Sequence, residues 1–249
     1  MLMYGATDIG MVRKENQDSY EIRTDLPSGH AAGVVCDGMG GPAGGQLASG
    51  IAVRAYMDCL ARLLLSGMDT QEVRQVSREA VSEANRAVWS AAREMGYPSM
   101  GTTLVSAVVC RSGVLISNVG DSRAYYLSDH RIMRVTRDHS LVQDMIERGE
   151  IKPEEARFHP KRNLITRALG PDETVACDNY ICSVRRNDAL LLCTDGLVNT
   201  LTDPEILEIV RASAPDRCPA LLIDAARGRG APDNVTALLI RNSEGDESS

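Results

Sequence analysis

The sequence shows few of the features that mark a membrane-bound or secreted protein. No stretch of its 249 residues reaches the run of about 18 apolar residues that a membrane span requires. The first ten residues contain neither a basic segment nor an apolar core, so they do not predict a secretion signal. We therefore expect a cytoplasmic protein without membrane contact.

Cysteine occurs seven times, but not with the spacing of a disulfide framework or a zinc site. The number is odd, and no C-x-x-C pair is present. Most of these residues lie within apolar runs, where free cysteine behaves as a small core residue. Buried, reduced thiols are therefore expected at Cys36, Cys59, Cys110, Cys177, Cys182, Cys193 and Cys218.

The chain also lacks an excess of positive charge. Its formal net charge is -7 and its pI about 5.2, which argues against nucleic-acid binding. The glycines after Asp37 are not followed by the G-K-[S/T] of a nucleotide-binding loop, and the Asp37 carboxylate would repel a pyrophosphate. The acidity is better explained by aspartates that gather to hold cations.

Hydrophobic spacing predicts strands and helices in separate groups. Short β-branched segments predict strands at 4–10, 18–24, 31–37, 102–110, 114–118, 123–127, 131–136, 175–184, 189–194 and 235–241, with a glycine-rich turn at 38–45. Apolar residues at helical spacing predict helices at 46–66, 69–95, 140–149, 153–156, 203–212 and 218–227, the second capped by Asp69 or Thr70. Consecutive helices between groups of strands favour an α+β layered sandwich.

No internal repeat or linker divides the chain. We therefore expect one domain over residues 1–242. The last residues, 243–249, are charged and polar, and a disordered acidic tail is expected there.

Five aspartates beside predicted strands are the most informative residues. Asp37 and Asp195 end apolar runs and precede glycine, while Asp233 comes directly before the last predicted strand. Asp121 lies between two predicted strands, and Asp18 lies in R-K-E-N-Q-D-S. A carboxylate at the end of a buried strand is costly unless a cation or donor compensates it. Because Mg²⁺ and Mn²⁺ prefer oxygen ligands, these residues are candidate metal ligands.

Each of these signals also has a structural interpretation when it is taken alone. Asp195 before glycine is typical of a turn, and Asp121 after Gly120 could close a hairpin. Arg13 alone would be a surface charge. A metal site is favoured only because these residues occur together.

Eight short motifs follow one another along the chain. They are R-K-E-N-Q-D-S at 13–19, D-G-M-G-G at 37–41, G-T-T at 101–103, N-V-G-D-S-R at 118–123, T-R-D-H-S at 136–140, H-P-K-R-N-L-I-T-R-A-L-G at 159–170, T-D-G-L at 194–197 and D-N-V-T at 233–236. In this order they resemble the metal-dependent protein phosphatases (the PPM family, or type 2C protein phosphatases), most closely the stand-alone bacterial members. The similarity extends from Thr7 to Ile240.

The resemblance implies a four-layer α-β-β-α sandwich of two antiparallel β-sheets flanked by helix pairs. It also implies a binuclear site for Mn²⁺ or Mg²⁺ at one edge of the sheets. Asp37 is then expected to bridge the two ions, and Asp195 and Asp233 to complete the protein ligands of the first. The carbonyl of Gly38 is expected to face the second ion, with Asp18 holding its waters.

By the same resemblance a third, weaker ion is expected near Asp121, and Asp195 would be a shared ligand of this ion. Arg13 corresponds to the arginine that grips the substrate phosphate, and a bidentate guanidinium suits phosphate oxygens. Residues 140–169 correspond to a flap that helps to select substrates. Arg13, Asp37 and Asp195 are thus the expected catalytic residues.

We expect a hydroxide bridging the two ions to attack phosphorus in line, without a phosphoenzyme. No cysteine lies in a C-x5-R loop, so a thiolate nucleophile has no support. Gln17 stands where the family often has glutamate, so the second ion is expected to depend mainly on Asp37, Gly38 and waters. Met39 stands where many eukaryotic relatives have a histidine suggested as general acid. His139 is a conceivable proton donor, although a structural role is expected for it.

The leading hypothesis is a monomeric phosphatase that removes phosphate from phosphoserine or phosphothreonine of proteins, its partners being the substrates of a Ser/Thr kinase. A pseudophosphatase that binds phosphoproteins without turnover is one alternative, and the retention of Asp37, Asp195 and Asp233 argues against it. A related hydrolase of a small phosphoester is the other, because specificity lies in the flap and the surface grooves.

Overall fold

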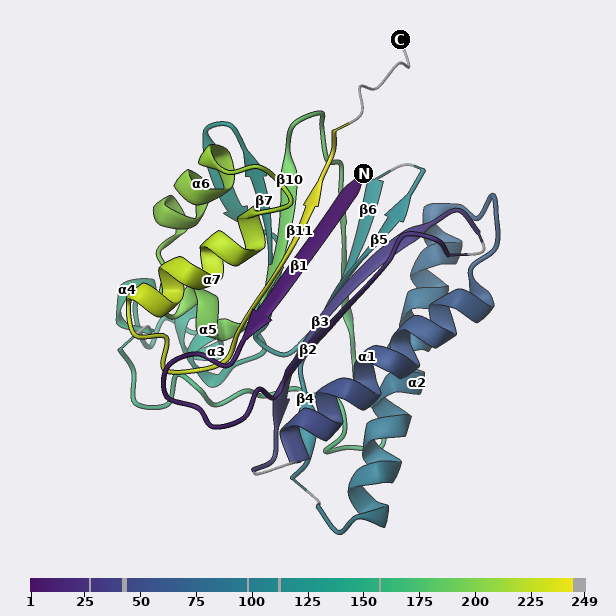
Figure 1. Ribbon diagram of the computed structural model, residues 1–249. Coiled ribbons are helices and arrows are strands. Elements are labelled where there is room, and N and C mark those ends of the chain that lie inside the picture. Colours follow the sequence, from purple (N-terminus) through teal and green to yellow (C-terminus); the bar gives the residue numbers. More distant parts are fainter. Residues whose placement is uncertain (27, 42–43, 98, 112, 157, 244–249) are drawn as a thin grey trace.

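Two antiparallel β-sheets lie face to face, and helices cover both outer faces (Figure 1). This computed structural model describes residues 1–243 except 27, 42–43, 98, 112 and 157. The expected four-layer α-β-β-α sandwich is therefore confirmed. The expected acidic tail at 243–249 lies outside the described residues, apart from Ser243.

The first sheet joins the two ends of the described chain. Its strand order is β1 (Leu2–Asp8), β11 (Val235–Arg241), β10 (Ala189–Cys193), β7 (Arg123–Ser128) and β8 (Arg131–Arg134). Helices α5 (Asp195–Val198), α6 (Asp203–Ala212) and α7 (Cys218–Gly228) cover its outer face (Figure 1).

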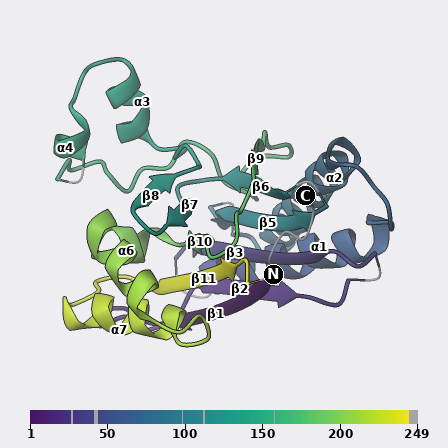
Figure 2. The same ribbon diagram turned by 90° about the horizontal axis from the view of Figure 1, so that it is seen from above.

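The second sheet is built from the segments between them. Its order is β2 (Asp18–Arg23), β3 (Ala31–Met39), β5 (Leu104–Cys110), β6 (Gly113–Val119) and β9 (Asp178–Cys182), and β4 (Gly101–Thr102) pairs with the end of β3. Helices α1 (Gly44–Leu63) and α2 (Thr70–Glu94) cover its outer face. Two short helices, α3 (Leu141–Glu147) and α4 (Pro153–Ala156), stand away from the layers (Figure 2).

Side chains that point alternately to the two faces of each strand form the apolar layers. In β10, Leu190 and Leu192 face the other sheet, whereas Leu191 and Cys193 face the helices. Side chains of successive strand residues point to opposite faces, so a strand covered on both faces is apolar throughout. This explains the unbroken apolar run that ends at the D-G of residues 195–196.

The expected element boundaries agree with the structure in most places, and the differences have local causes. The expected strand at 102–110 is split into β4 and β5, and that at 175–184 is shortened to β9. The expected turn at 38–45 is wrong at both ends, because Gly38 and Met39 extend β3 through pairing with β4 and Gly44 already begins α1. Asp195 before glycine is typical of a turn, but Asp195–Val198 form the helix α5. Asp69 caps α2 as expected.

The seven cysteines are all free thiols. Five are buried as expected, whereas Cys177 and Cys182 are half-buried. No helix among the described residues combines the length and the apolar character needed to cross a bilayer.

A buried hydroxyl cluster ties α1 and α2 to the second sheet. The Tyr56 hydroxyl lies 2.9 Å from Ser77 Oγ and 2.7 Å from Ser106 Oγ, and Ser77 Oγ lies 2.8 Å from Ser117 Oγ. All four residues are fully buried. Loss of one member would leave buried polar partners without a hydrogen bond, which is costly.

We therefore expect Tyr56→Phe to lower the free energy of unfolding by about 1–3 kcal/mol, because it removes the side-chain partner of the buried Ser106 hydroxyl and one of the two bonds of Ser77. Urea unfolding measures the change. Tyr97→Phe is the control, since Tyr97 is 46% exposed and surface changes usually stay within about 0.5 kcal/mol. Equal effects of the two substitutions would contradict the role of the cluster.

Candidate active site

The ends of β3 and β10 and the start of β11 lie at the lower edge of the sheets in Figure 1. The residues around them line a cleft of about 620 Å³. It therefore receives residues from both sheets and from the flap. Of the seven residues expected at the site, six line its wall, namely Arg13, Asp37, Gly38, Asp121, Asp195 and Asp233.

The seventh, Asp18, lies behind this wall with 6% of its surface exposed. It is paired across the strands with Asp37, so the two carboxylates leave the sheet side by side. Its Oδ2 accepts hydrogen bonds from Thr194 Oγ1 at 2.9 Å and Thr236 Oγ1 at 2.7 Å. Thr236 lies in β11 and Thr194 directly follows β10, so Asp18 joins the two sheets behind the cleft.

The backbone around Asp37 is fixed by its neighbours in β4 and β5. Asp37 N–H donates to Thr103 Oγ1 at 2.9 Å, and Thr102 Oγ1 donates to the Asp37 carbonyl at 2.8 Å. At Gly38 a Cβ atom would lie 2.0 Å from the Gly45 carbonyl oxygen. Only glycine at position 38 lets the start of α1 approach this closely.

Asp195 and Asp233 reach the cleft from adjacent ends of β10 and β11. Asp195 Oδ2 accepts from Asn199 Nδ2 at 3.0 Å, on the next turn of the chain. Asp233 Oδ2 accepts from Arg13 at 2.7 Å. With 54% of the Arg13 side chain exposed, this ion pair is solvent-screened and weak.

Asn234 fixes the loop that carries Arg13. Its Nδ2 donates to the carbonyls of Ile9 and Glu15 at 2.9 and 3.0 Å, and its Oδ1 accepts from Gln17 N–H at 2.9 Å. The D-N-V-T motif thus fixes the loop and also carries Asp233, one of the expected ligands. Asn234 and the two threonines that hold Asp18 were not expected at the site, although all three lie within the T-D-G-L and D-N-V-T motifs.

The aspartates influence each other strongly. Burial raises the pKa of Asp37 well above its usual value, and the charges of Asp18, Asp195, Asp121 and Asp233 raise it further. Burial also raises the pKa of Asp18 to about 7 and that of Asp195 to about 6, with contributions from neighbouring carboxylates. Burial first, and then Asp195, raises the pKa of Asp121. Residues up to 215 positions apart therefore converge in one place.

The site fits hard divalent cations. Asp18 Oδ1 and Asp195 Oδ1 are buried and find no hydrogen-bond partner among the described residues. A bound cation, or water on it, would compensate such oxygens. Within the described part of the chain, no three His, Cys, Asp or Glu side chains form a metal-binding cluster by themselves. Mg²⁺ sites commonly use one or two carboxylates together with water, so this donor set still suits such ions.

Comparison with known proteins decides the family. The model of the family described as protein phosphatase 2C matches residues 12–219. The serine/threonine phosphatase stp of Listeria monocytogenes is 37% identical over 239 residues, which cover 94% of this chain and 93% of the relative. The chain belongs to the protein phosphatase 2C family.

Solved structures agree with this family. Serine/threonine phosphatase Stp1 from Staphylococcus aureus superposes with a TM-score of 0.89 at 33% identity, covering 95% of this chain and 93% of that one. The catalytic domain of serine threonine protein phosphatase PstP, solved in complex with 2 manganese ions, gives a TM-score of 0.80 at 31% identity, covering 96% of each chain. The protein is thus a serine/threonine phosphatase of a metal-dependent family.

Three further residues of this phosphatase were singled out by the sequence. Gln17 donates from Nε2 to the Gly41 carbonyl at 3.0 Å and lines the cleft, as does Met39. His139 is 1% exposed, and both of its ring nitrogens lie within hydrogen-bond distance of protein groups. Its burial favours the structural role that was expected over proton donation to a substrate.

We expect the free energy of unfolding of the metal-free phosphatase to fall as the pH rises from about 4 to about 7. In this window folded Asp18 and Asp195 keep protons that the unfolded chain, with carboxyl pKa values near 3.9, has lost. The folded state binds more protons, so stability decreases with pH. The loss should be at least about 1 kcal/mol, since one pKa unit corresponds to about 1.4 kcal/mol.

Urea unfolding in EDTA across this pH range measures the effect. Asp18→Asn should make the decrease shallower, and Mn²⁺ at neutral pH should restore stability. A stability that rises throughout the window would contradict the electrostatic account of the cleft.

Proposed function

We propose that this chain hydrolyses phosphoserine and phosphothreonine of proteins in the carboxylate cleft, with two divalent cations, Mn²⁺ or Mg²⁺, held by Asp37, Asp195 and Asp233. The observation that carries the proposal is a cluster of mutually repelling carboxylates beside an arginine in an open cleft. Such a cluster costs free energy unless cations occupy it. Membership of the phosphatase family supplies the reaction.

In this proposal each acidic residue has a separate task. Asp37, whose pKa is raised by both Asp18 and Asp195, would be a ligand of both ions, and the Gly38 carbonyl and waters held by Asp18 would complete the second position. Asp121, which also lines the cleft, would hold a third and weaker ion. When bound, such cations activate water as a nucleophile and neutralise charge on the phosphoryl group.

Arg13 is proposed to bind the phosphate. Its guanidinium can donate two parallel hydrogen bonds to phosphate oxygens and keeps its charge at any relevant pH. It is already in the cleft, paired with Asp233. A cation at Asp233 would compete for that carboxylate, which leaves the guanidinium free for the substrate.

A groove beside the cleft gives room for a protein substrate. This second hollow of about 540 Å³ shares Arg13, Asp195 and Asp233 with the cleft. Flap residues line it as well, including Phe158, which is 81% exposed, and Arg162. We propose that the flap at 140–169 contacts residues on either side of the phosphorylated one. The substrates would be those of a Ser/Thr kinase.

We further propose that residues 1–242 act as one catalytic domain and as a monomer. Support for one domain comes from the cleft itself, because both sheets contribute to it. The seven unpaired cysteines suit the reducing cytoplasm, which we propose as the location.

Asp195→Ala should abolish metal-dependent hydrolysis while the protein stays folded. A metal centre supplies several kcal/mol of stabilisation of the transition state, so a loss of at least about 100-fold is expected. Release of phosphate from a phosphothreonine peptide and from p-nitrophenyl phosphate is measured with Mn²⁺ and then with EDTA. Asp216→Ala, at an exposed aspartate, is the matched control and should retain full activity.

The same assay separates the alternatives. Release from the small ester alone would indicate a small-phosphoester hydrolase. Binding of the phosphopeptide without metal-dependent release from either compound would indicate a pseudophosphatase. Full activity of Asp195→Ala would contradict the ligand assignment.

Arg13→Ala should lower kcat/KM for the phosphothreonine peptide by about 10- to 100-fold, because hydrogen bonds to charged groups contribute about 1.5–3 kcal/mol. Arg13→Lys should recover only part of this loss, since a lysine keeps the charge but not the bidentate fork. Steady-state kinetics in Mn²⁺ measures both. Arg86→Ala, at an exposed arginine on α2, is the control. Activity of Arg13→Ala equal to that of the control would remove Arg13 from the proposal.

A further inference from the structure

The T-R-D-H-S motif at residues 136–140 takes no part in the chemistry described so far, yet it is highly connected. It links β8 to α3, and its five side chains bond to β7, to α3 and to the turn between β6 and β7. The recorded bonds are Ala124 N–H to Thr136 Oγ1, Arg137 to Asp144 and Glu147, Arg123 to Asp138, Gly120 N–H to His139, and Gln143 N–H to Ser140 Oγ.

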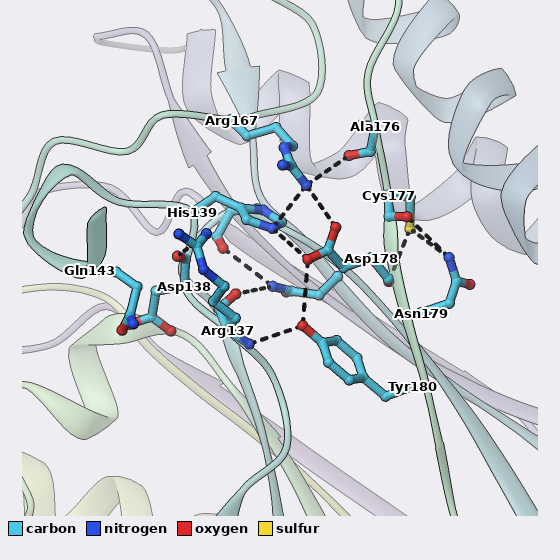
Figure 3. A network of polar contacts seen from close by, with 12 residues as sticks. Arg137, Asp138, His139, Gln143, Arg167, Ala176, Cys177, Asp178, Asn179 and Tyr180 are labelled. Carbon is cyan, nitrogen blue, oxygen red and sulfur yellow. Dashed lines mark hydrogen bonds and ion pairs between the residues drawn. The ribbon is translucent and has the colours of Figure 1, made fainter. Parts of the chain in front are cut away.

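His139 forms hydrogen bonds with both the N–H and the carbonyl of Gly120. The Gly120 N–H donates to His139 Nδ1 at 3.0 Å, and the His139 backbone N–H donates to the Gly120 carbonyl at 3.0 Å. Because Nδ1 accepts, a neutral ring carries its proton on Nε2. Nε2 lies 3.2 Å from Asp178 Oδ2, to which it donates its proton, and 2.9 Å from a guanidinium nitrogen of Arg167 (Figure 3). Arg167 has no acceptor, so its own proton goes to Asp178 Oδ1 and not to the protonated Nε2, and the two side chains together fix the ring orientation. Burial lowers the pKa of His139 and so favours the neutral ring.

The turn that His139 holds is also the turn that carries Asp121. Gly120 has a φ of +105°, and a Cβ atom there would lie 2.6 Å from Thr103 Cγ2. Any other residue would be strained, so this peptide has one favourable arrangement. On the other side of Asp121, Ser122 Oγ lies 2.6 Å from Thr103 Oγ1. Asp121 is thus positioned from both sides through its neighbours.

His139 also contacts the base of the flap. Its carbonyl accepts from Thr166 N–H at 2.8 Å, and residues 140 and 165 form a β-bridge. Arg167 donates to Asp178 Oδ1 at 2.9 Å, and Figure 3 shows Arg167 and Asp178 on the Nε2 side of the imidazole. Ile165, two residues before Arg167, lines the cleft. The same histidine therefore joins the flap base to the Gly120–Asp121 turn.

We propose that His139 is a positioning residue, which keeps the Asp121 carboxylate aimed into the cleft by holding Gly120 through Nδ1 and is itself oriented by Asp178 and Arg167. This inference rests on the proposed function, because it concerns the cation that Asp121 would hold. The imidazole makes one contact through Nδ1, with Gly120, and another through Nε2, with Asp178, and each can be tested separately.

Two conservative variants divide the contacts of the ring. In His139→Asn the amide oxygen can take the place of Nδ1 and still accept from Gly120. In His139→Gln the amide nitrogen can take the place of Nε2 and reach Asp178, but no acceptor remains for Gly120. His130→Gln removes an exposed histidine from the β7–β8 turn and is the matched control.

Two measurements are made on each variant with Mn²⁺ as the probe. One is kcat and KM on p-nitrophenyl phosphate as a function of Mn²⁺ concentration. The other is the increase of Tm that Mn²⁺ causes without substrate. Groups that orient a metal ligand typically change metal affinity or activity by about 10- to 100-fold. His139→Gln should therefore need at least about 10-fold more Mn²⁺ for half-maximal kcat and show a smaller increase of Tm. His139→Asn and His130→Gln should stay close to wild type in both.

The inference is overturned if His139→Gln responds to Mn²⁺ like wild type. It is also overturned if both His139 variants lose activity equally while their Tm still rises with Mn²⁺ as in wild type, since that is a general structural effect. Wild-type protein without phosphatase activity would instead contradict the proposed function, and the increase of Tm would still test His139.

The tautomer offers a test that requires no variant to fold. The ¹⁵N chemical shifts of the imidazole nitrogens of wild-type protein should show His139 with its proton on Nε2 and an unprotonated Nδ1. A proton on Nδ1 would exclude the bond from Gly120 and overturn the proposal.

Discussion

Repulsion among clustered carboxylates is the constraint on which the cleft depends. Folding brings five aspartates together, and each makes ionisation of its neighbours less favourable. The fold tolerates this because the cost is confined to one edge, while apolar layers on both sides of each sheet supply the stability. The proposed divalent cations would convert the same repulsion into binding energy, so the feature that destabilises the metal-free protein would also create its affinity for metal.

Neutral groups, rather than opposite charges, keep Asp18 and the backbone of Asp37 in place. Hydroxyls of Thr194 and Thr236 hold Asp18, and that of Thr103 meets the backbone of Asp37. A lysine in these positions would compensate the charge and compete with a cation. Hydroxyls and peptide groups orient the carboxylates but leave their charge available.

Much of this arrangement could be predicted from the sequence. Periodicity indicated most of the strands and helices, and the order of the motifs indicated the family, which the comparisons confirm. The aspartates could be predicted as candidate metal ligands because carboxylates at strand ends are unusual. Their individual roles as ligands stay predictions, although the structure brings all of them to one edge.

Other parts could not be predicted, for physical reasons. α5 begins at Asp195 in a sequence that is equally compatible with a turn, and only packing against the first sheet favours the helix. The extension of β3 to Met39 depends on β4, a partner of two residues some 60 positions away. The function of His139 lies in its contacts with the peptide groups of Gly120, and backbone groups carry no sequence signal.

The pairing of β1 with β11 has a consequence for the order of assembly. β11 lies between β1 and β10, so the strand made first stays without its neighbour until residue 241 has been synthesised. Contacts of such large sequence separation are slow to form. During translation the second sheet and its two helices can collapse early, whereas Arg13 and Asp233 meet only when the last strand is inserted. A nascent chain should therefore form part of its hydrophobic core before the cleft is complete.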